Sequence, residues 1–477
     1  MHWNTGSRHD FAFSIQYLGW QDVNDLLDGL GNTGSDASFD RAVGWLDNCV
    51  NNHGCNGGTS HLGPRRILDL EPEGLPTSDI RLTEETHEDW TTVRYACLSH
   101  CWGNSVPCTT TMENVANHKA AIQYSALPRT FQDAVWFCRK LRLRWLWIDS
   151  LCILQDNETD WKEQAGMMAD IYSNAYVTLA ATKSSNSSQG LYSLRSKPVA
   201  ACQVLINNEQ YMIYTQCRLD TRHPDANPDS SELSHFPLLG RGWAFQERML
   251  SQRILHFGPD ELGFECMEST ECECGNGVFM TDHSDGTLRS RFVPKSFSNR
   301  SWYEICLGYG SCELTFAKDT LPALAGLAKQ YKKTSKNHYN GRYLSGIWEE
   351  DLISSLGWAS GEVYQSRPIK FDSRLPSWTW ASNMLTAPIL SMYVPVVDIK
   401  SVQIHDIVYE LAGPDPFGEV DRTYLECSSE MITIPLRWGA LDAVYERNTE
   451  RDYRILESLT GFHLTSLLLE LVPIKWY

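Results

Sequence analysis

The stretch that decides the fold runs from Tyr95 to Thr182. Its first apolar run is Tyr95-Ala96-Cys97-Leu98-Ser99, followed by His100-Cys101-Trp102-Gly103. The second run is Trp145-Leu146-Trp147-Ile148-Asp149 and the third is Tyr176-Val177-Thr178-Leu179-Ala180-Ala181. Runs of this length, rich in aromatic and β-branched residues, are typical of buried strands.

Two amphipathic patterns separate the three runs. Residues 130–141 follow Pro128, and Thr130 with Asp133 resembles a capping box at the start of a helix. Residues 160–175 carry a second apolar stripe at helical spacing. Strand, helix, strand, helix, strand predicts an α/β fold with a parallel sheet and right-handed crossovers.

Polar residues follow the first two strands where each strand ends. Ser99, His100 and Trp102 come after the first, and Asp149 and Asp156 come after the second. The carboxyl ends of parallel strands meet at one edge of the sheet, where α/β proteins build their sites. We therefore expect these residues to form a candidate site.

The rest of the chain divides into three expected regions. Residues 1–90 are a lead-in with a helix near 39–50 and short strands at 64–70 and 80–82, residues 91–250 are the α/β domain, and residues 251–477 are a C-terminal region. That last region reads as helical over 299–358 and β-rich from 377 onwards, including 394–399, 402–409 and 431–436. Gly29–Gly34 matches the dinucleotide fingerprint by letter, but a helical pattern precedes it where a strand is required, so we interpret it as a polar linker.

Composition excludes several classes of function. The 477 residues carry 41 basic and 59 acidic side chains, a net charge of −18, which argues against nucleic-acid binding. We find no secretory signal at the N-terminus and no apolar run long enough to span a bilayer. Fifteen cysteines scattered without a framework fit reduced thiols, so we expect a cytoplasmic protein.

A group of cysteines and one histidine suggests a structural metal. Thiolates and imidazole are the ligands that zinc prefers, and two segments supply them: Cys49, His53 and Cys55 in one, and Cys272 and Cys274, with Cys266 nearby, in the other. Their spacing is not that of a standard zinc finger. Ordinary thiols therefore remain the alternative interpretation.

Several blocks of the sequence resemble the fungal heterokaryon-incompatibility (HET) domain proteins. The blocks are 95–103, 127–128, 146–156, 160–175, 190–192 and Arg241-Gly242-Trp243-Ala244-Phe245-Gln246-Glu247-Arg248, with 343–352 and 376–382 as C-terminal companions. The family is associated with non-self recognition and with a cell-death reaction when incompatible hyphae fuse. Its domain looks distantly related to the Toll/interleukin-receptor-type (TIR) fold, so the resemblance implies a TIR-like parallel sheet flanked by helices.

The resemblance also implies a reaction. Some TIR-type domains cleave NAD with a glutamate that follows a tryptophan early in a helix, and here Glu163 follows Trp161. A carboxylate near the ribose would stabilise the oxocarbenium-like transition state. We assign Glu163, Asp149 and His100 to catalysis, and assign to binding Ser99, Trp102, Asp156, Trp161, Gln164 and Trp243. NAD would be a substrate, and no cofactor is required.

Two alternatives stand beside this assignment. The residue three after Trp161 is Gln164, so the carboxylate comes one residue early, which turns it by about 100° on a helix. With Asp160 as N-cap, Glu163 would be the third-position acid of a capping box. His100 near Cys101 and Cys152 also suggests a Cys–His nucleophile.

We hypothesise an incompatibility or cell-death effector that acts through self-association of its HET domain and cleaves NAD. A second hypothesis is a HET-like enzyme that transforms a small molecule in fungal secondary metabolism. A third is a non-enzymatic interaction module. We find no Walker A motif, zinc-protease helix or G-x-S-x-G elbow, so those chemistries are not expected.

Overall fold

A computed structural model of the chain describes most of its first three quarters and parts of the rest. The described ranges are 32–55, 61–74, 76, 78–84, 89–103, 108–194, 199–206, 209–216, 235–273, 299–334, 341–356, 359–360, 375–376, 378–383, 389–391, 403–412, 415–418, 420–428 and 474–476. The chain divides into two compact units. Unit 1 comprises 1–157, 174–238 and 251–288, and unit 2 comprises 158–173, 239–250 and 289–477.

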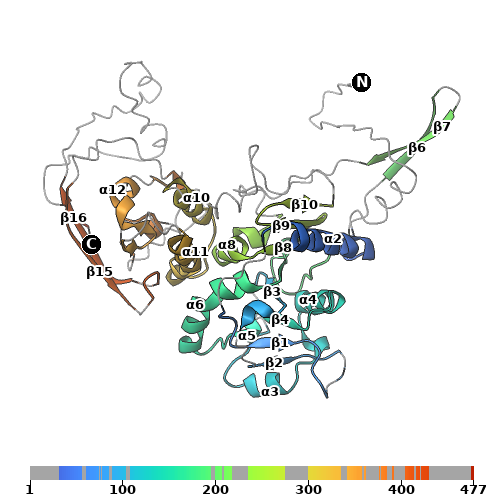
Figure 1. Cartoon of the computed structure of the whole chain (residues 1–477), viewed down its shortest axis with the longest axis horizontal. Coiled ribbons are helices and arrows are strands. Elements are labelled where there is room, and N and C mark those ends of the chain that lie inside the picture. Colours follow the sequence, from blue (N-terminus) through green and yellow to red (C-terminus); the bar gives the residue numbers. More distant parts are fainter. Residues whose placement is uncertain are drawn as a thin grey trace. The chain divides into compact units, whose positions relative to one another are not determined.

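Unit 1 is built on an eight-stranded sheet with the order β10-β9-β8-β5-β3-β4-β1-β2 (Figure 1). The three strands expected from sequence are at its centre: β3 (Tyr95–Ser99), β4 (Trp145–Ile148) and β5 (Val177–Ala180). They run parallel, and β8 (Arg253–Phe257) continues the parallel part beside β5. The prediction of a mixed α/β fold with a central parallel sheet is confirmed.

The centre of the sheet is apolar on both faces. Every residue of β3, β5 and β8 is buried, and Cys97 lies between Trp147 of β4 and Thr178 of β5. Continuous burial is expected where helices cover both faces of parallel strands. This explains why the three runs read as unbroken apolar stretches and not as an alternating pattern.

Antiparallel strands extend the parallel centre of the sheet on both sides. On one side β1 (Ile67–Asp69) pairs antiparallel with β4 and with β2 (Arg81–Thr83). On the other side β9 (Leu262–Cys266) pairs antiparallel with β8 and with β10 (Thr270–Cys272). Short turns join β8 to β9 and β9 to β10, and antiparallel pairing of such hairpin strands needs no crossover helix. The sheet therefore extends across the expected boundaries at residues 90 and 250.

Four of the described helices belong to unit 1: α2 (Asp36–Asn52), α3 (Val115–Ala120), α4 (Arg129–Lys140) and the short α5 (Asp149–Cys152). Helix α2 packs beside β9, and α4 packs beside β4 (Figure 1). The expected capping box of α4 is wrong, because the helix begins at Arg129. Thr130 and Asp133 instead accept hydrogen bonds from the backbone of Gly190 and Leu191.

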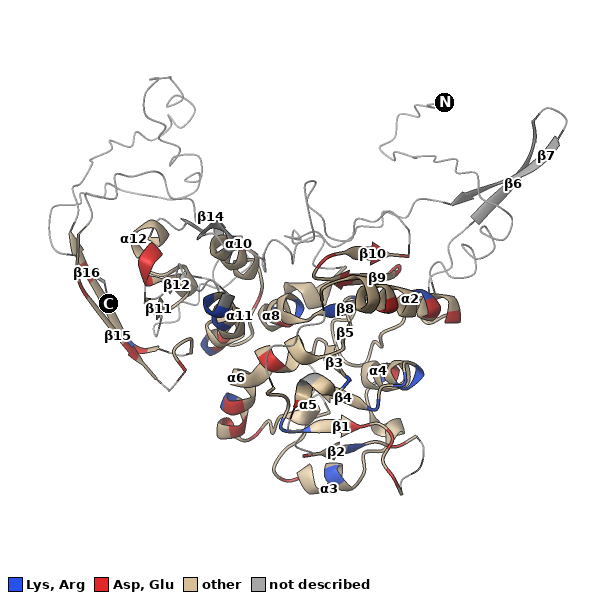
Figure 2. Cartoon of the chain, in the orientation of Figure 1, with Lys and Arg blue, Asp and Glu red and all other residues tan. Residues whose placement is uncertain are grey.

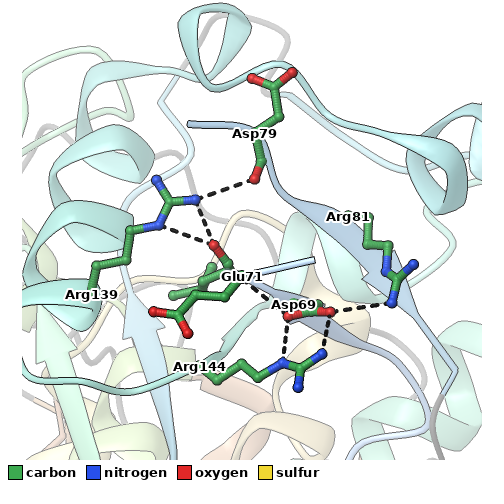
Figure 3. A network of polar contacts seen from close by, with 7 residues as sticks. Asp69, Glu71, Asp79, Arg81, Arg139 and Arg144 are labelled. Atoms are coloured by element: carbon green, nitrogen blue, oxygen red, sulfur yellow. Dashed lines mark hydrogen bonds and ion pairs between the residues drawn. The ribbon is translucent and has the colours of Figure 1, made fainter. Parts of the chain in front are cut away.

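A network of charged side chains contacts strands β1 and β2 at one side of the sheet (Figure 3). The buried carboxylate of Asp69 accepts two hydrogen bonds from Arg144, at 2.8 and 3.0 Å, and one from Arg81 at 3.3 Å. Arg139, in the basic last turn of α4 (Figure 2), donates to the carbonyl oxygens of Leu70 and Asp79. Polar contacts thus join β1, β2 and the end of α4.

Unit 2 is helical and then β-rich. Its helices are α6 (Glu158–Asn174, whose last residue belongs to unit 1), α8 (Gly242–Leu250), α10 (Asn299–Gly310), α11 (Pro322–Thr334) and α12 (Leu352–Ser355). Two-stranded pairs follow, β11 (Tyr343–Leu344) with β12 (Ile347–Trp348) and β13 (Ala359–Ser360) with β14 (Ile389–Ser391). A three-stranded sheet comprises β15 (Gln403–Leu411), β16 (Val420–Ser428) and β17 (Ile474–Trp476).

The remaining predictions have mixed outcomes. Strands β6 (Val199–Ile206) and β7 (Glu209–Gln216) form an antiparallel pair. Residues 29–31 of the glycine motif and the expected strands at 394–399 and 431–436 lie outside the described residues. Among the helices that are described, none is long and apolar enough to cross a bilayer.

Candidate functional site

The strand exits of β3 and β4 bring together three of the expected site residues. The indole Nε1 of Trp102 donates a hydrogen bond to Asp149 Oδ2 at 2.8 Å. The imidazole Nδ1 of His100 lies 3.7 Å from Asp149 Oδ1. We call His100, Trp102 and Asp149 the strand-exit cluster. Its members are up to 49 residues apart in sequence, and the parallel pairing of β3 with β4 makes them neighbours.

The strand-exit cluster combines a buried base with a reachable carboxylate. The side chain of His100 is 1% exposed and packs edge-on against Phe131, with ring centroids 4.9 Å apart. The side chain of Asp149 is 20% exposed, and its Oδ1 also accepts the backbone N–H of Ser150 at 2.7 Å. Ser99, the last residue of β3, is also buried. Asp149 is therefore a carboxylate fixed by two donors with one side open to solvent.

The polar loop at residues 184–190 contacts the backbone near the cluster, at Cys101 and Gly103. Gly103 has φ +78°, and a Cβ there would lie 2.4 Å from Cβ of Asn186. Only glycine permits this backbone conformation together with so close an approach. The hydroxyl of Ser187 donates to the carbonyl of Cys101 at 3.4 Å. Residues 184–190 thus border the strand exit.

Asp156, expected in the same site, anchors a neighbouring loop. Its side chain is exposed, and its Oδ1 accepts the backbone N–H of Met112 at 2.8 Å. Thr110 holds the same loop, because its backbone N–H donates to Ser150 and its hydroxyl donates to Leu151. The contact with Met112 fixes the loop that follows residues 104–107.

The expected residues of α6 belong to unit 2. Glu163 is exposed, whereas Gln164, the next residue along the helix, is buried. The two neighbouring positions therefore have different surroundings. The capping-box interpretation of Glu163 is wrong, because α6 begins at Glu158 and Asp160 already lies within its first turn. Glu163 is a solvent-facing helix residue.

Trp161 and Trp243 lie together within unit 2. Their rings meet edge to face, with centroids 6.2 Å apart. Lys318 Nζ lies 5.5 Å from the Trp161 ring, and Trp243 Nε1 donates to Asp319 Oδ2 at 3.1 Å. These contacts join α6 and α8 to the segment that precedes α11, which gives both tryptophans a packing role.

The Cys–His nucleophile has little support in the geometry. Burial raises the pKa of the Cys152 thiol to about 12, so the thiol is protonated at neutral pH. Its backbone carbonyl accepts a hydrogen bond from the buried Arg66. Thiols with a raised pKa in apolar surroundings are poor nucleophiles. Cys101 is also buried.

Four of the six candidate metal ligands come together in the structure. Ligand atoms of Cys49, His53, Cys55 and Cys266 all lie within 4.8 Å of one another, and we call these four residues the thiol–histidine cluster. Cys272 is not among them, because its strand pairs it with Gly263, whereas Cys266 sits at the turn of the same hairpin. Cys274 lies outside the described residues. Hydrogen bonds from Cys49 and Cys55 lower the pKa of Cys266 well below its usual range, and the contact with Cys266 raises the pKa of Cys49.

A second buried histidine, His256, was not expected from the sequence. His256 of β8 lies between Thr182 Oγ1, 3.1 Å from its Nδ1, and Glu265 Oε2, 3.2 Å from its Nε2. All three are 1% exposed or less. A substrate cannot reach them, so their polar contacts support the sheet. The sequence pattern that could have indicated this pair is a His and a Glu within the mostly apolar sequences of β8 and β9.

A cavity of about 710 Å³ lies near the amino ends of β3 and β4, whereas the strand-exit cluster lies at their carboxyl ends. Its lining includes Arg94, Lys140, Arg142 and Arg144 together with the rings of Phe39, Trp145 and Tyr176. Arg94 stacks over Tyr176 and Arg144 over Trp145, at 5.0 and 4.8 Å. The cavity is distinct from the strand-exit cluster.

Comparisons with known proteins concern the region that carries the cluster. Residues 95–247 match the family described as "Heterokaryon incompatibility protein (HET)". A similar curated protein is "Heterokaryon incompatibility protein 6, OR allele" of Neurospora crassa, 30% identical over 118 residues that cover 23% of this chain and 17% of that protein. No solved structure matches. Residues 95–247 are thus similar to a HET domain, and the chain spans about a sixth of the length of the curated protein that it matches.

Proposed function

We propose that this chain acts in heterokaryon incompatibility, and that the strand-exit cluster is the functional site of its HET domain. The matched region, residues 95–247, contains both strand exits that form the cluster. The similar Neurospora crassa protein is named for heterokaryon incompatibility. The observation that carries the proposal is the fixed, partly exposed carboxylate of Asp149 beside the buried imidazole of His100.

Cleavage of the nicotinamide–ribose bond of NAD is the reaction we propose for this cluster. Positive charge develops on the ribose in the transition state, and a carboxylate held in place stabilises it without having to reorganise. Asp149 is held by the Trp102 indole and by the Ser150 N–H. Glu163 is exposed on a helix face. We therefore propose Asp149 as the acting carboxylate, with His100 beside it as a positioning group.

The test is nicotinamide release from NAD by the purified full chain, measured by chromatography. Asp149→Asn keeps the size of the side chain and removes its charge, and we expect the rate to fall about 100-fold or more. Glu163→Gln is expected to leave the rate unchanged. Glu113→Gln, at another exposed carboxylate of unit 1, is the matched control for Asp149. Release that is lost in Glu163→Gln and kept in Asp149→Asn would contradict the assignment of the carboxylate.

Expression in a fungal host separates this proposal from the two other hypotheses. We propose that the chain self-associates in the cytoplasm and triggers cell death, so growth should stop on expression and recover with Asp149→Asn. Growth arrest that persists in Asp149→Asn, with no nicotinamide release from the wild type, would favour an interaction module. Harmless expression together with turnover of another small molecule would favour an enzyme of secondary metabolism.

A further inference from the structure

We infer that the thiol–histidine cluster of Cys49, His53, Cys55 and Cys266 binds a structural zinc ion that fastens helix α2 to the β9–β10 hairpin. The four ligand atoms lie within 4.8 Å of one another. In a tetrahedral site with Zn–S bonds of about 2.3 Å and Zn–N bonds of about 2.0 Å, ligand atoms of three thiolates and one imidazole lie about 3.5 to 3.8 Å apart. His53 Nδ1 and Cys266 Sγ are already 3.3 Å apart.

Helix geometry explains why the first three ligands converge. Cys49 and His53 are four residues apart at the end of α2, so both side chains lie on one face of the helix. The helix ends at Asn52 and His53 is its C-cap, after which extended backbone turns Cys55 back toward the same point. A Cys-x₃-His-x-Cys sequence at a helix end therefore supplies three ligands from one short segment.

The fourth ligand has the surroundings of a metal-bound thiolate. The backbone N–H groups of Glu268 and Ser269 donate to Cys266 Sγ at 3.4 and 3.2 Å, and Ser269 Oγ lies 3.3 Å from it. Donors of this kind orient a ligating sulfur and stabilise its negative charge. Glu268 Oε1 in turn accepts the N–H of Gly54, which lies between two ligands of the other segment. This hydrogen bond holds the turn after β9 next to the end of α2, so the two ligand segments lie together without a metal.

Burial and charge both favour a closed site. Cys49, Cys55 and Cys266 are buried, and His53 is the half-buried member at the rim. Four protein ligands leave no open position for a water molecule, which is typical of a structural and not a catalytic zinc. The C-terminal end of α2 carries partial negative charge and has no basic residue in its last turn. A divalent cation there is electrostatically favourable.

Contacts along α2 show what the metal would hold together. Ser38 and Arg41, near the other end of the helix, contact the Glu273 carboxylate, which also accepts the N–H of Leu262 in β9. Trp45 stacks on Phe264 of β9 with centroids 6.3 Å apart. The cluster completes this row of contacts at the last turn of the helix. The zinc would therefore bind a helix that precedes the matched HET region to strands that follow it.

The test is the metal content of the full chain purified under reducing conditions without chelator, measured by inductively coupled plasma mass spectrometry. We expect about one zinc ion per chain. Cys266→Ser and Cys55→Ser should lose it. Cys272→Ser is the matched control, since Cys272 is a buried thiol of the same hairpin that lies outside the cluster, and it should retain the metal.

Two further measurements keep the proposal testable if a cysteine variant does not fold. Cobalt in place of zinc in the wild-type chain should give the intense visible absorption of a tetrahedral, thiolate-rich site. Ser269→Ala, which removes one donor to Cys266, should lower zinc affinity about 10-fold in competition with a chelator while the stoichiometry stays the same. A folded, metal-free wild type after growth with added zinc would overturn the proposal. Equal metal loss in Cys272→Ser and Cys266→Ser, or a disulfide among the three cysteines in peptide mapping, would also overturn it.

Discussion

The Trp102 indole donates to Asp149 Oδ2 at 2.8 Å, which links the exit of β3 to the exit of β4. The same carboxylate receives the Ser150 N–H through its other oxygen. Both oxygens of Asp149 are therefore oriented before any ligand arrives. Preorganisation of this kind is what an electrostatic catalyst or a selective binding group requires.

We predict that Trp102→Phe loosens this carboxylate and keeps the aromatic ring. A hydrogen bond to a charged group contributes about 1.5 to 3 kcal/mol, and the partial exposure of Asp149 favours the lower end. The melting temperature of unit 1 should fall by roughly 3 to 6 °C in differential scanning calorimetry. Trp136→Phe, at an exposed indole on α4, is the control and should change it little. Equal shifts in the two variants would show that the bond to Asp149 contributes no specific stability.

A second prediction concerns the Asp69 network (Figure 3). Burial alone would raise the pKa of Asp69, but hydrogen bonds from Arg144 and Glu71 and the charges of Arg144 and Arg81 lower it overall. A hydrogen bond to a charged group contributes about 1.5 to 3 kcal/mol, and the partial exposure of Arg144 and Arg81 favours the lower end, so Asp69→Asn should unfold at a lower urea concentration. The measurement is the free energy of unfolding of unit 1 at a series of pH values.

The direction of the pH dependence follows from the lowered pKa. A carboxyl with a depressed folded pKa contributes stability that is fully present above its unfolded pKa of about 3.9 and is lost as pH falls through its folded pKa. The gap between wild type and Asp69→Asn should thus be constant from neutral pH down to about pH 5 and shrink below about pH 4. Glu71→Gln, at an exposed side chain, should change stability by less than about 0.5 kcal/mol at any pH. A gap that does not narrow in acid would refute the assignment.

The central strands were predictable because their sequence signal is local. Residues 95–99, 145–148 and 177–180 are continuous apolar runs, and helical stripes between them fix the crossovers. The edges were not predictable in the same way. Leu68 pairs with both Leu82 and Leu146, and a strand of three residues carries too little pattern to reveal a partner nearly eighty positions away.

The candidate site shows the same limit. His100, Trp102 and Asp149 were expected together because each follows a central strand, and parallel pairing brings strand ends to one edge. The sequence alone could not show that Cys266 and not Cys272 joins the metal-ligand cluster. Which of the two cysteines faces α2 depends on the hairpin register of β9 and β10. A one-residue change of register reverses the face of every side chain in a strand. Spacing along the chain does not contain that information.

The last prediction concerns Gly190, which follows the polar loop beside the strand-exit cluster. Gly190 has φ +75°, and a Cβ would lie 2.7 Å from Asp133 Oδ2, the oxygen that accepts the Leu191 N–H. Gly190→Ala should therefore destabilise unit 1 by more than about 1 kcal/mol, through backbone strain and displacement of the Asp133 carboxylate. Gly44→Ala is the matched control, because Gly44 lies within α2 with no atom near its added Cβ, and it should stabilise the helix by about 0.5 to 1 kcal/mol. Chemical denaturation of both variants measures the two effects, and opposite signs are expected. A Gly190→Ala variant at least as stable as the wild type would mean that the Gly190 turn tolerates a side chain and that Asp133 does not hold it.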